Sequence, residues 1–303
     1  MIVKNQYIKL FIFFLLATIL YVFTIKQVIL ATIILVILFI IIVFIADLIP
    51  AKEMREAKGD PEKLYLYGNK LLLNEYYSEA KKAAKIFKKV TDIDPNHKDA
   101  YVQLGSLLFE LKKPEEALKA FKRAQELGVN EIETWFFIGE CYLLINDPEN
   151  AISSYEYALK ADGNELDDPC LVTDYHVRSL RGMGEGYLRL GKLDRALQSF
   201  KNILDIENTE RSGDVLAKIA EIEFKHGNYS EVIKTGRLAI PHLYLTDKTR
   251  LLIARAICHT QEPEKALDEL EKMDFCEIST RELFKYREFD QFRDSDRFKI
   301  LTG

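Results

Sequence analysis

The sequence has few of the residues that build disulfide frameworks, metal sites or catalytic centres. Its 303 residues include only four cysteines, none of them in a C-x-x-C pair. Isolated cysteines favour reduced thiols over a disulfide framework. The sequence also has no G-x-x-x-x-G-K-[ST], H-E-x-x-H or G-x-S-x-G motif, which are patterns typical of nucleotide-binding or hydrolytic sites. We therefore expect no enzyme activity, no bound metal and no cofactor.

Positive charge is also scarce. The chain has 42 lysines and arginines against 47 aspartates and glutamates, a formal net charge of −5. After Pro50 the counts are 39 basic and 46 acidic residues. A general nucleic-acid-binding protein needs a concentrated basic surface. The composition therefore argues against a nucleic-acid partner.

Charge is almost absent from residues 7–49. Two apolar stretches, 8–25 and 28–49, are separated by Lys26 and Gln27. A helix needs about 20 apolar residues to cross the hydrocarbon of a bilayer, so residues 1–50 are predicted to form a transmembrane helical hairpin that contacts lipid through residues 8–49. The alternative, a cleaved secretory signal, would need an apolar core of only ~7–15 residues and a small-residue cleavage site.

The flanking charges predict the orientation of this hairpin. Lys4 and Lys9 precede the first stretch and Lys52 and Arg55 follow the second, whereas only Lys26 lies between the two. Positive residues favour the cytoplasmic side, so we expect a multi-pass protein of the cytoplasmic membrane with the rest of the chain in the cytoplasm. If only the second stretch spans, the rest of the chain would be periplasmic.

A pattern of large and small residues recurs every 34 residues, most clearly in residues 98–131, 132–165 and 177–210. A period of this length is typical of stacked helix–turn–helix units, in which small residues let helices approach and large residues fill the gaps. Each copy has a pair ending in glycine, then an alanine and an aromatic residue: Leu104-Gly105, Ala117 and Phe121; Ile138-Gly139, Ala151 and Tyr155; Met183-Gly184, Ala196 and Phe200.

With these residues the chain resembles the tetratricopeptide repeat family. Weaker copies at 213–246 and 247–280, and a stretched copy that begins at about residue 61, bring the total to six repeats over 61–280. The resemblance implies an all-α fold, a right-handed superhelical α-solenoid of helix pairs. Pro114 and Pro148 are expected to open second helices, where the missing N–H of proline costs nothing.

The segments around the repeats have their own compositions. Residues 51–60 are charged and are predicted to be a linker, and residues 281–303 a C-terminal capping helix or tail. Residues 164–176 are an acidic insertion, which we interpret as a polar loop. Its potential metal ligands, Asp168, Cys170, Asp174 and His176, lack the spacing of a metal site.

The resemblance also implies a concave groove built from the first helix of each repeat. We expect the groove to be acidic with exposed aromatic residues at one end and basic further along, which suits an extended or helical peptide of mixed charge. Phe109 and Phe136 would be the anchors. The alternative is that these charges form only a solvated face. The predicted groove residues are Val102, Phe109, Glu110, Glu133, Phe136, Glu140, Arg178, Arg181, Arg189, Lys248 and Arg255.

Together these features predict a membrane-anchored scaffold or adaptor that binds a protein or peptide partner in the groove. Two alternatives remain open at this point. One is a periplasm-facing component of an envelope or motility assembly, and the other is a non-catalytic regulatory subunit of a membrane enzyme. The closing segment, 289–298, resembles that of bacterial tetratricopeptide proteins and indicates a bacterial origin.

Overall fold

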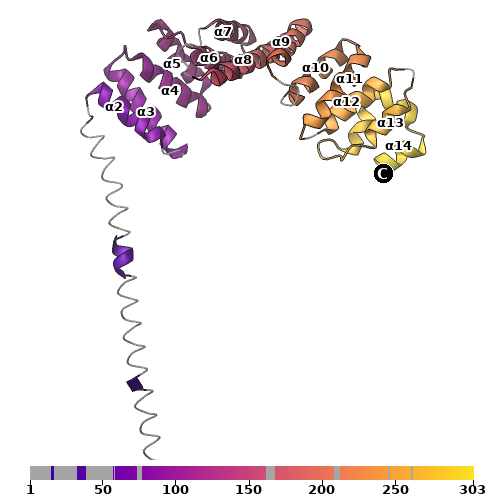
Figure 1. The fold of residues 1–303 in the computed structure, drawn as a ribbon, viewed down its shortest axis with the longest axis horizontal. Coiled ribbons are helices and arrows are strands. Elements are labelled where there is room, and N and C mark those ends of the chain that lie inside the picture. Colours follow the sequence, from indigo (N-terminus) through magenta and orange to yellow (C-terminus); the bar gives the residue numbers. More distant parts are fainter. Residues whose placement is uncertain are drawn as a thin grey trace, which may run out of the picture. The chain divides into compact units, whose positions relative to one another are not determined.

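A computed structural model describes residues 15–16, 33–38, 57, 59–73, 77–161, 168–207, 212–244, 246–260 and 262–303. The described chain is helical and contains no strand in these ranges (Figure 1). This confirms the predicted all-α fold. The chain divides into two compact units, residues 1–95 and 96–303, which we describe one at a time.

From residue 61 onward the described helices follow one another as antiparallel pairs, and the two helices of each pair pack together (Figure 1). The pairs are α2 (Pro61–Leu72) and α3 (Tyr77–Ile93), α4 (Lys98–Glu110) and α5 (Pro114–Glu126), α6 (Ile132–Leu144) and α7 (Pro148–Lys160), α8 (Pro169–Arg189) and α9 (Leu193–Ile206), α10 (Gly213–Lys225) and α11 (Tyr229–Ala239), and α12 (Asp247–Ile257) and α13 (Lys265–Leu270).

Glycine lets the two helices of a pair approach closely. In the first unit, a Cβ added to Gly68 would lie 2.8 Å from ring atoms of Phe87. In the second unit a Cβ on Gly105 would lie 2.7 Å from the ring of Phe121, and three further glycines touch aromatic rings in the same way. Contacts this short leave no room for a side chain. Gly139 approaches Tyr155 and Gly184 approaches Phe200 within their own helix pairs, whereas Gly182 of α8 approaches Tyr155 of the preceding pair.

From its composition we predicted that the insertion, residues 164–176, is a polar loop, but most of it is helical. Residues 169–176 form the first two turns of α8, which begins eight residues before the predicted repeat start at Val177. Asp168 caps the helix by accepting a 2.9 Å hydrogen bond from the Cys170 backbone N–H, and Pro169 occupies the first turn. Both residues favour a helix start at this point.

The C-terminal segment folds over the last helix pair. It consists of the 3₁₀ helices η4 (Thr280–Lys285) and η5 (Arg287–Phe292) and the short α14 (Asp296–Thr302). Leu283, Phe289 and Phe298 are buried in one cluster with Ile253 and Leu270. A solenoid exposes the apolar face of its last repeat unless another element covers it, and this segment provides the cover.

The prediction of a multi-pass membrane location is contradicted. Within the described residues, no helix combines the length and the apolar character that crossing a membrane requires. About 20 helical residues would be needed, whereas the described residues of the two expected spans, 8–25 and 28–49, are only 15–16 and 33–38. The remainder of these spans, and most of the 51–60 linker, lie outside the described residues. The predicted lipid contact through residues 8–49 is likewise unsupported.

Candidate functional site: a groove along the first helices

The first helices of successive pairs contribute to one hollow on the second unit. Its volume is about 470 Å³, and its lining comes from α6, α8 and α10 together with one residue of α9. Four of the predicted groove residues, Phe136, Glu140, Arg178 and Arg181, belong to this lining. The other lining residues are Leu143, Gly182, Glu185, Phe200, Asp214 and Lys218.

Phe136 lies in the floor of this hollow and is not the exposed anchor that we predicted. Only 2% of its surface is accessible. Its ring packs against those of Tyr155 and Tyr175, with centroids 6.1 Å and 5.5 Å away. The guanidinium carbon of Arg178 lies 4.3 Å above the ring, in a cation–π contact,. Tyr175, which the extension of α8 supplies, is one of the side chains that cover Phe136.

Glu140 and Glu133 are each held by a tyrosine. The Tyr155 hydroxyl donates a hydrogen bond to Glu140 at 2.5 Å. Burial of Tyr155, followed by the nearby charge of Glu140, raises the pKa of this hydroxyl. The pKa of Tyr175 is raised in the same way, first by burial and then by the charge of Glu133. Both tyrosines therefore stay protonated and act as donors. Glu140 is thereby held in the lining of the hollow, whereas Glu133 lies outside that lining.

The arginines of α8 connect neighbouring helices. Arg181 forms an ion pair with Asp214 of α10. Arg189 donates a 2.5 Å hydrogen bond to the Leu143 carbonyl oxygen, near the end of α6. Arg178 pairs with Asp174 of its own helix at 3.3 Å. These side chains are 37–44% exposed, and exposed pairs of this kind contribute only about 0–1 kcal/mol each.

The three predicted groove residues of α4, Val102, Phe109 and Glu110, lie outside the lining of this hollow. Val102 is half-buried and Glu110 is exposed. Phe109 is half-buried because its ring packs against Phe137, with centroids 5.3 Å apart.

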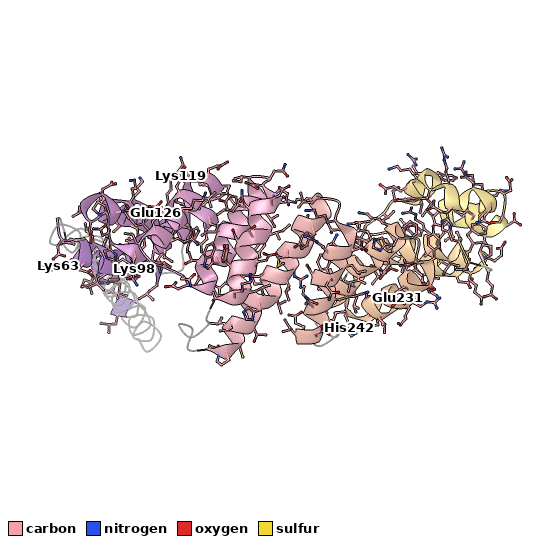
Figure 2. All side chains as sticks on the ribbon, turned by 90° about the horizontal axis from the view of Figure 1, so that it is seen from above. Lys63, Lys98, Lys119, Glu126, Glu231 and His242 are labelled. Atoms are coloured by element: carbon pink, nitrogen blue, oxygen red, sulfur yellow. The ribbon has the colours of Figure 1, made fainter. Side chains whose placement is uncertain are left out.

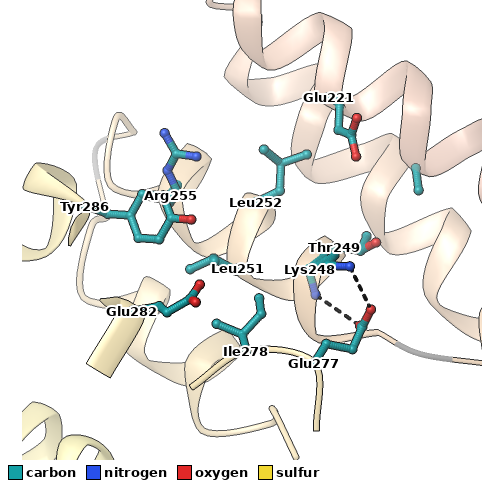
Figure 3. Close-up of a pocket in the computed structure, with 11 residues that line it drawn as sticks. Glu221, Lys248, Thr249, Leu251, Leu252, Arg255, Glu277, Ile278, Glu282 and Tyr286 are labelled. Carbon is teal, nitrogen blue, oxygen red and sulfur yellow. Dashed lines mark hydrogen bonds and ion pairs between the residues drawn. The ribbon is translucent and has the colours of Figure 1, made fainter. Parts of the chain in front are cut away.

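A second hollow, of about 420 Å³, contains the last two predicted residues, Lys248 and Arg255. It is lined by α10, α12 and the C-terminal segment (Figure 3). Lys248 pairs with Glu277 at 3.6 Å, and Arg255 pairs with Glu288 at 2.8 Å. The prediction of a basic groove end is therefore wrong, because both cations have acidic partners, Glu277 just before η4 and Glu288 in η5.

The sequence reasoning did not identify the contribution of α10. Asp214 and Lys218 line the first hollow, and Ala217 and Glu221 line the second. Asp214, Ala217 and Glu221 occupy positions 2, 5 and 9 of the repeat that starts at Gly213. The predicted groove residues Glu133, Phe136 and Glu140 occupy the same positions of the repeat that starts at Ile132. The repeat positions would therefore have identified these three residues of α10 from the sequence.

Two family models match the sequence. Both describe the tetratricopeptide repeat, over residues 77–135 and 132–165. The chain contains tetratricopeptide repeats. No curated protein matches it.

Solved structures of other proteins share the fold. One is YrrB, described as a TPR protein with an unusual peptide-binding site, which is 18% identical over 64% of this chain and 91% of its own, with a TM-score of 0.52. Another is pilF of Pseudomonas aeruginosa, 16% identical over 77% and 96% of the two chains, with a TM-score of 0.53. The C-terminal part of a TPR repeat-containing protein from Cytophaga hutchinsonii is 16% identical over 78% and 92%, with a TM-score of 0.59. At these identities the likeness concerns the fold alone.

Proposed function

We propose that this tetratricopeptide repeat protein is a non-catalytic interaction scaffold that holds a peptide segment of a partner along its first helices. The observation that carries the proposal is the 470 Å³ hollow, to which helices of three successive repeats contribute. Its volume falls within the ~300–1,000 Å³ of ordinary ligand sites. The peptide-binding site of YrrB supports the same mode of action.

The hollow has the composition of an interaction surface. Phe136, Leu143 and Phe200 form an apolar floor, and charged side chains of both signs surround it. Protein interfaces combine a buried apolar centre with a polar rim in this way. The rim pairs are exposed and weak, so a partner can exchange them for its own charges at little cost.

A selection of peptides tests the proposal. Random peptides displayed on phage are selected against the full chain, and the affinities of the selected peptides are measured for wild type and for Arg178→Glu/Arg181→Glu. We expect at least a tenfold loss, or ~1.4 kcal/mol, because the double variant reverses two rim charges. Lys119→Glu is the matched control, since Lys119 projects from α5, the second helix of its pair (Figure 2).

The control variant should bind as wild type does. Circular dichroism and urea denaturation of each variant distinguish a lost contact from a lost fold. Selected peptides that bind the double variant and wild type equally well would contradict the proposal, as would a failure to select any peptide.

A further inference from the structure

The second hollow differs from the first in having one wall made by the C-terminal segment. Leu251, Leu252 and Ile278 are its apolar lining, and Glu221 and Glu282 lie on opposite sides of them (Figure 3). One carboxylate comes from α10 and the other from η4. An elongated guest with an apolar stem and one charged end fits this arrangement better than a flat or wholly apolar guest.

Both cations of this hollow already have acidic partners. Glu277 is only 11% exposed and receives both the Lys248 ammonium, at 3.6 Å, and the Lys248 backbone N–H, at 3.4 Å. Glu288 is 17% exposed and accepts two hydrogen bonds from Arg255. The Arg255 guanidinium also lies 4.5 Å from the ring centroids of both Phe224 and Tyr286. An anionic guest would have to displace partly buried carboxylates that are each held by two contacts.

Glu221 and Glu282 are held much less firmly. Each pairs with a lysine three residues away on its own helix, Lys218 at 3.0 Å and Lys285 at 3.6 Å. All four side chains are at least 42% exposed, and exposed pairs at this spacing contribute about 0.2–1 kcal/mol. Lys218 lines the first hollow, on the other side of α10. These two carboxylates are therefore available to a cation that enters the second hollow.

We propose that the second hollow is a subsite for a lysine or arginine side chain of the bound partner. The methylene stem of this side chain packs on Leu251, Leu252 and Ile278, and its charged end pairs with Glu221 or Glu282, which lie on either side of this apolar lining. Long basic side chains bury their stems on apolar surface in this manner while the charged end stays at the rim. The proposal rests on the scaffold function above and specifies the chemistry of the partner at one end of the groove.

The test uses the full chain and the peptides selected on it. The selected peptides should share a lysine or arginine at one position. Their affinity should fall about tenfold in Glu221→Gln/Glu282→Gln, and by a similar factor when that basic residue is replaced by norleucine. The matched control is Glu231→Gln, because Glu231 forms the same kind of exposed pair, with Lys234 at 3.2 Å, on the second helix α11 (Figure 2).

A charge exchange makes the test specific. Glu221→Lys/Glu282→Lys should reject the basic peptide and bind its lysine-to-glutamate version at least tenfold better than wild type does. The subsite is refuted, and the scaffold function kept, if Arg178→Glu/Arg181→Glu weakens the peptides but the Glu221 and Glu282 variants do not. If neither set of variants changes the affinity, both proposals fail.

Discussion

Arg255 joins α12 to the C-terminal segment through Glu288. Its Nε and Nη2 atoms donate hydrogen bonds of 2.9 Å and 2.8 Å to the same carboxylate oxygen. The guanidinium lies between the rings of Phe224 and Tyr286. This one side chain thus links the fifth and sixth helix pairs to the segment that covers the last repeat.

The Arg255–Glu288 pair makes stability depend on pH. Burial alone would raise the pKa of Glu288, but its backbone N–H and Arg255 lower the pKa below the usual 4.5. Because the folded pKa of Glu288 lies below the unfolded one, the pair stabilises the fold fully above about pH 4.5. This contribution is lost as pH falls through the folded pKa. Glu288→Gln should lower the free energy of unfolding by about 2 kcal/mol at pH 7, and by progressively less toward pH 3.5.

Urea denaturation across that pH range measures both effects. Glu231→Gln, which removes one exposed ion pair on α11, should cost less than about 0.5 kcal/mol throughout. A loss for Glu288→Gln that is the same at pH 7 and pH 3.5 would contradict this account.

Lys112 occupies a backbone conformation that suits glycine. Four repeats turn between their two helices through a residue at the same position, with φ of 60° at Lys112, 62° at Asn146, 69° at Gly191 and 79° at Gly227. A side chain with a Cβ pays roughly 1–2 kcal/mol in this left-handed region. Because glycine also loses more chain entropy on folding, we expect Lys112→Gly to raise the free energy of unfolding by about 0.5–1 kcal/mol.

The reverse substitution, Gly191→Lys, should lower the free energy of unfolding by a similar amount. Lys113 is the matched control because it adjoins Lys112 but has φ −120°, which any residue adopts. Lys113→Gly should therefore destabilise the fold, and thermal unfolding of the three variants compares the signs. Destabilisation by Lys112→Gly would show that the strain is absent.

The contact between Gly105 and Phe121 predicts a strong coupling between these positions. Gly105→Ala would place a Cβ 2.7 Å from the Phe121 ring, and overpacking of this kind costs typically 1–3 kcal/mol. The last repeat already combines Ala254 with Leu270 at the equivalent positions, both fully buried. The double variant Gly105→Ala/Phe121→Leu should therefore lose less free energy of unfolding than the two single variants lose in sum. The difference should be at least ~1 kcal/mol in a double-mutant cycle measured by urea denaturation. Additive losses would exclude steric conflict as the cause.

These packing positions explain why helix starts could be predicted from the sequence. Lys98, Ile132, Gly213 and Asp247 are predicted repeat starts and are also the first residues of α4, α6, α10 and α12. The spacing between small and large residues is a local property of each repeat, so it can be read without knowledge of distant contacts. The early start of α8 at Pro169 was also readable, since an aspartate followed by proline is a typical helix start.

The charge of the groove end could not be predicted in this way. Glu277 and Glu288 follow their partners Lys248 and Arg255 by about 30 residues. Glu277 lies at the end of the last repeat and Glu288 in the C-terminal segment, which lacks the repeat period. No local pattern indicates that they fold back onto α12. Part of the cover over Phe136 has the same origin, because Tyr175 comes from the inserted turns of α8.

The four cysteines should separate into two pairs by reactivity. Burial is the main cause that raises the pKa of Cys141 and of the half-buried Cys258 to about 12, so much less of each thiol is ionised at pH 8 than of an unperturbed cysteine. Cys170 and Cys276 are exposed. A disulfide reagent at pH 8 should therefore modify the exposed pair within minutes and the other two only after unfolding in guanidinium, as mass spectrometry of the digested protein would show. Cys170→Ser should leave one rapid site, and rapid modification of Cys141 in the native chain would mean that α6 does not pack against α5 and α7 as described.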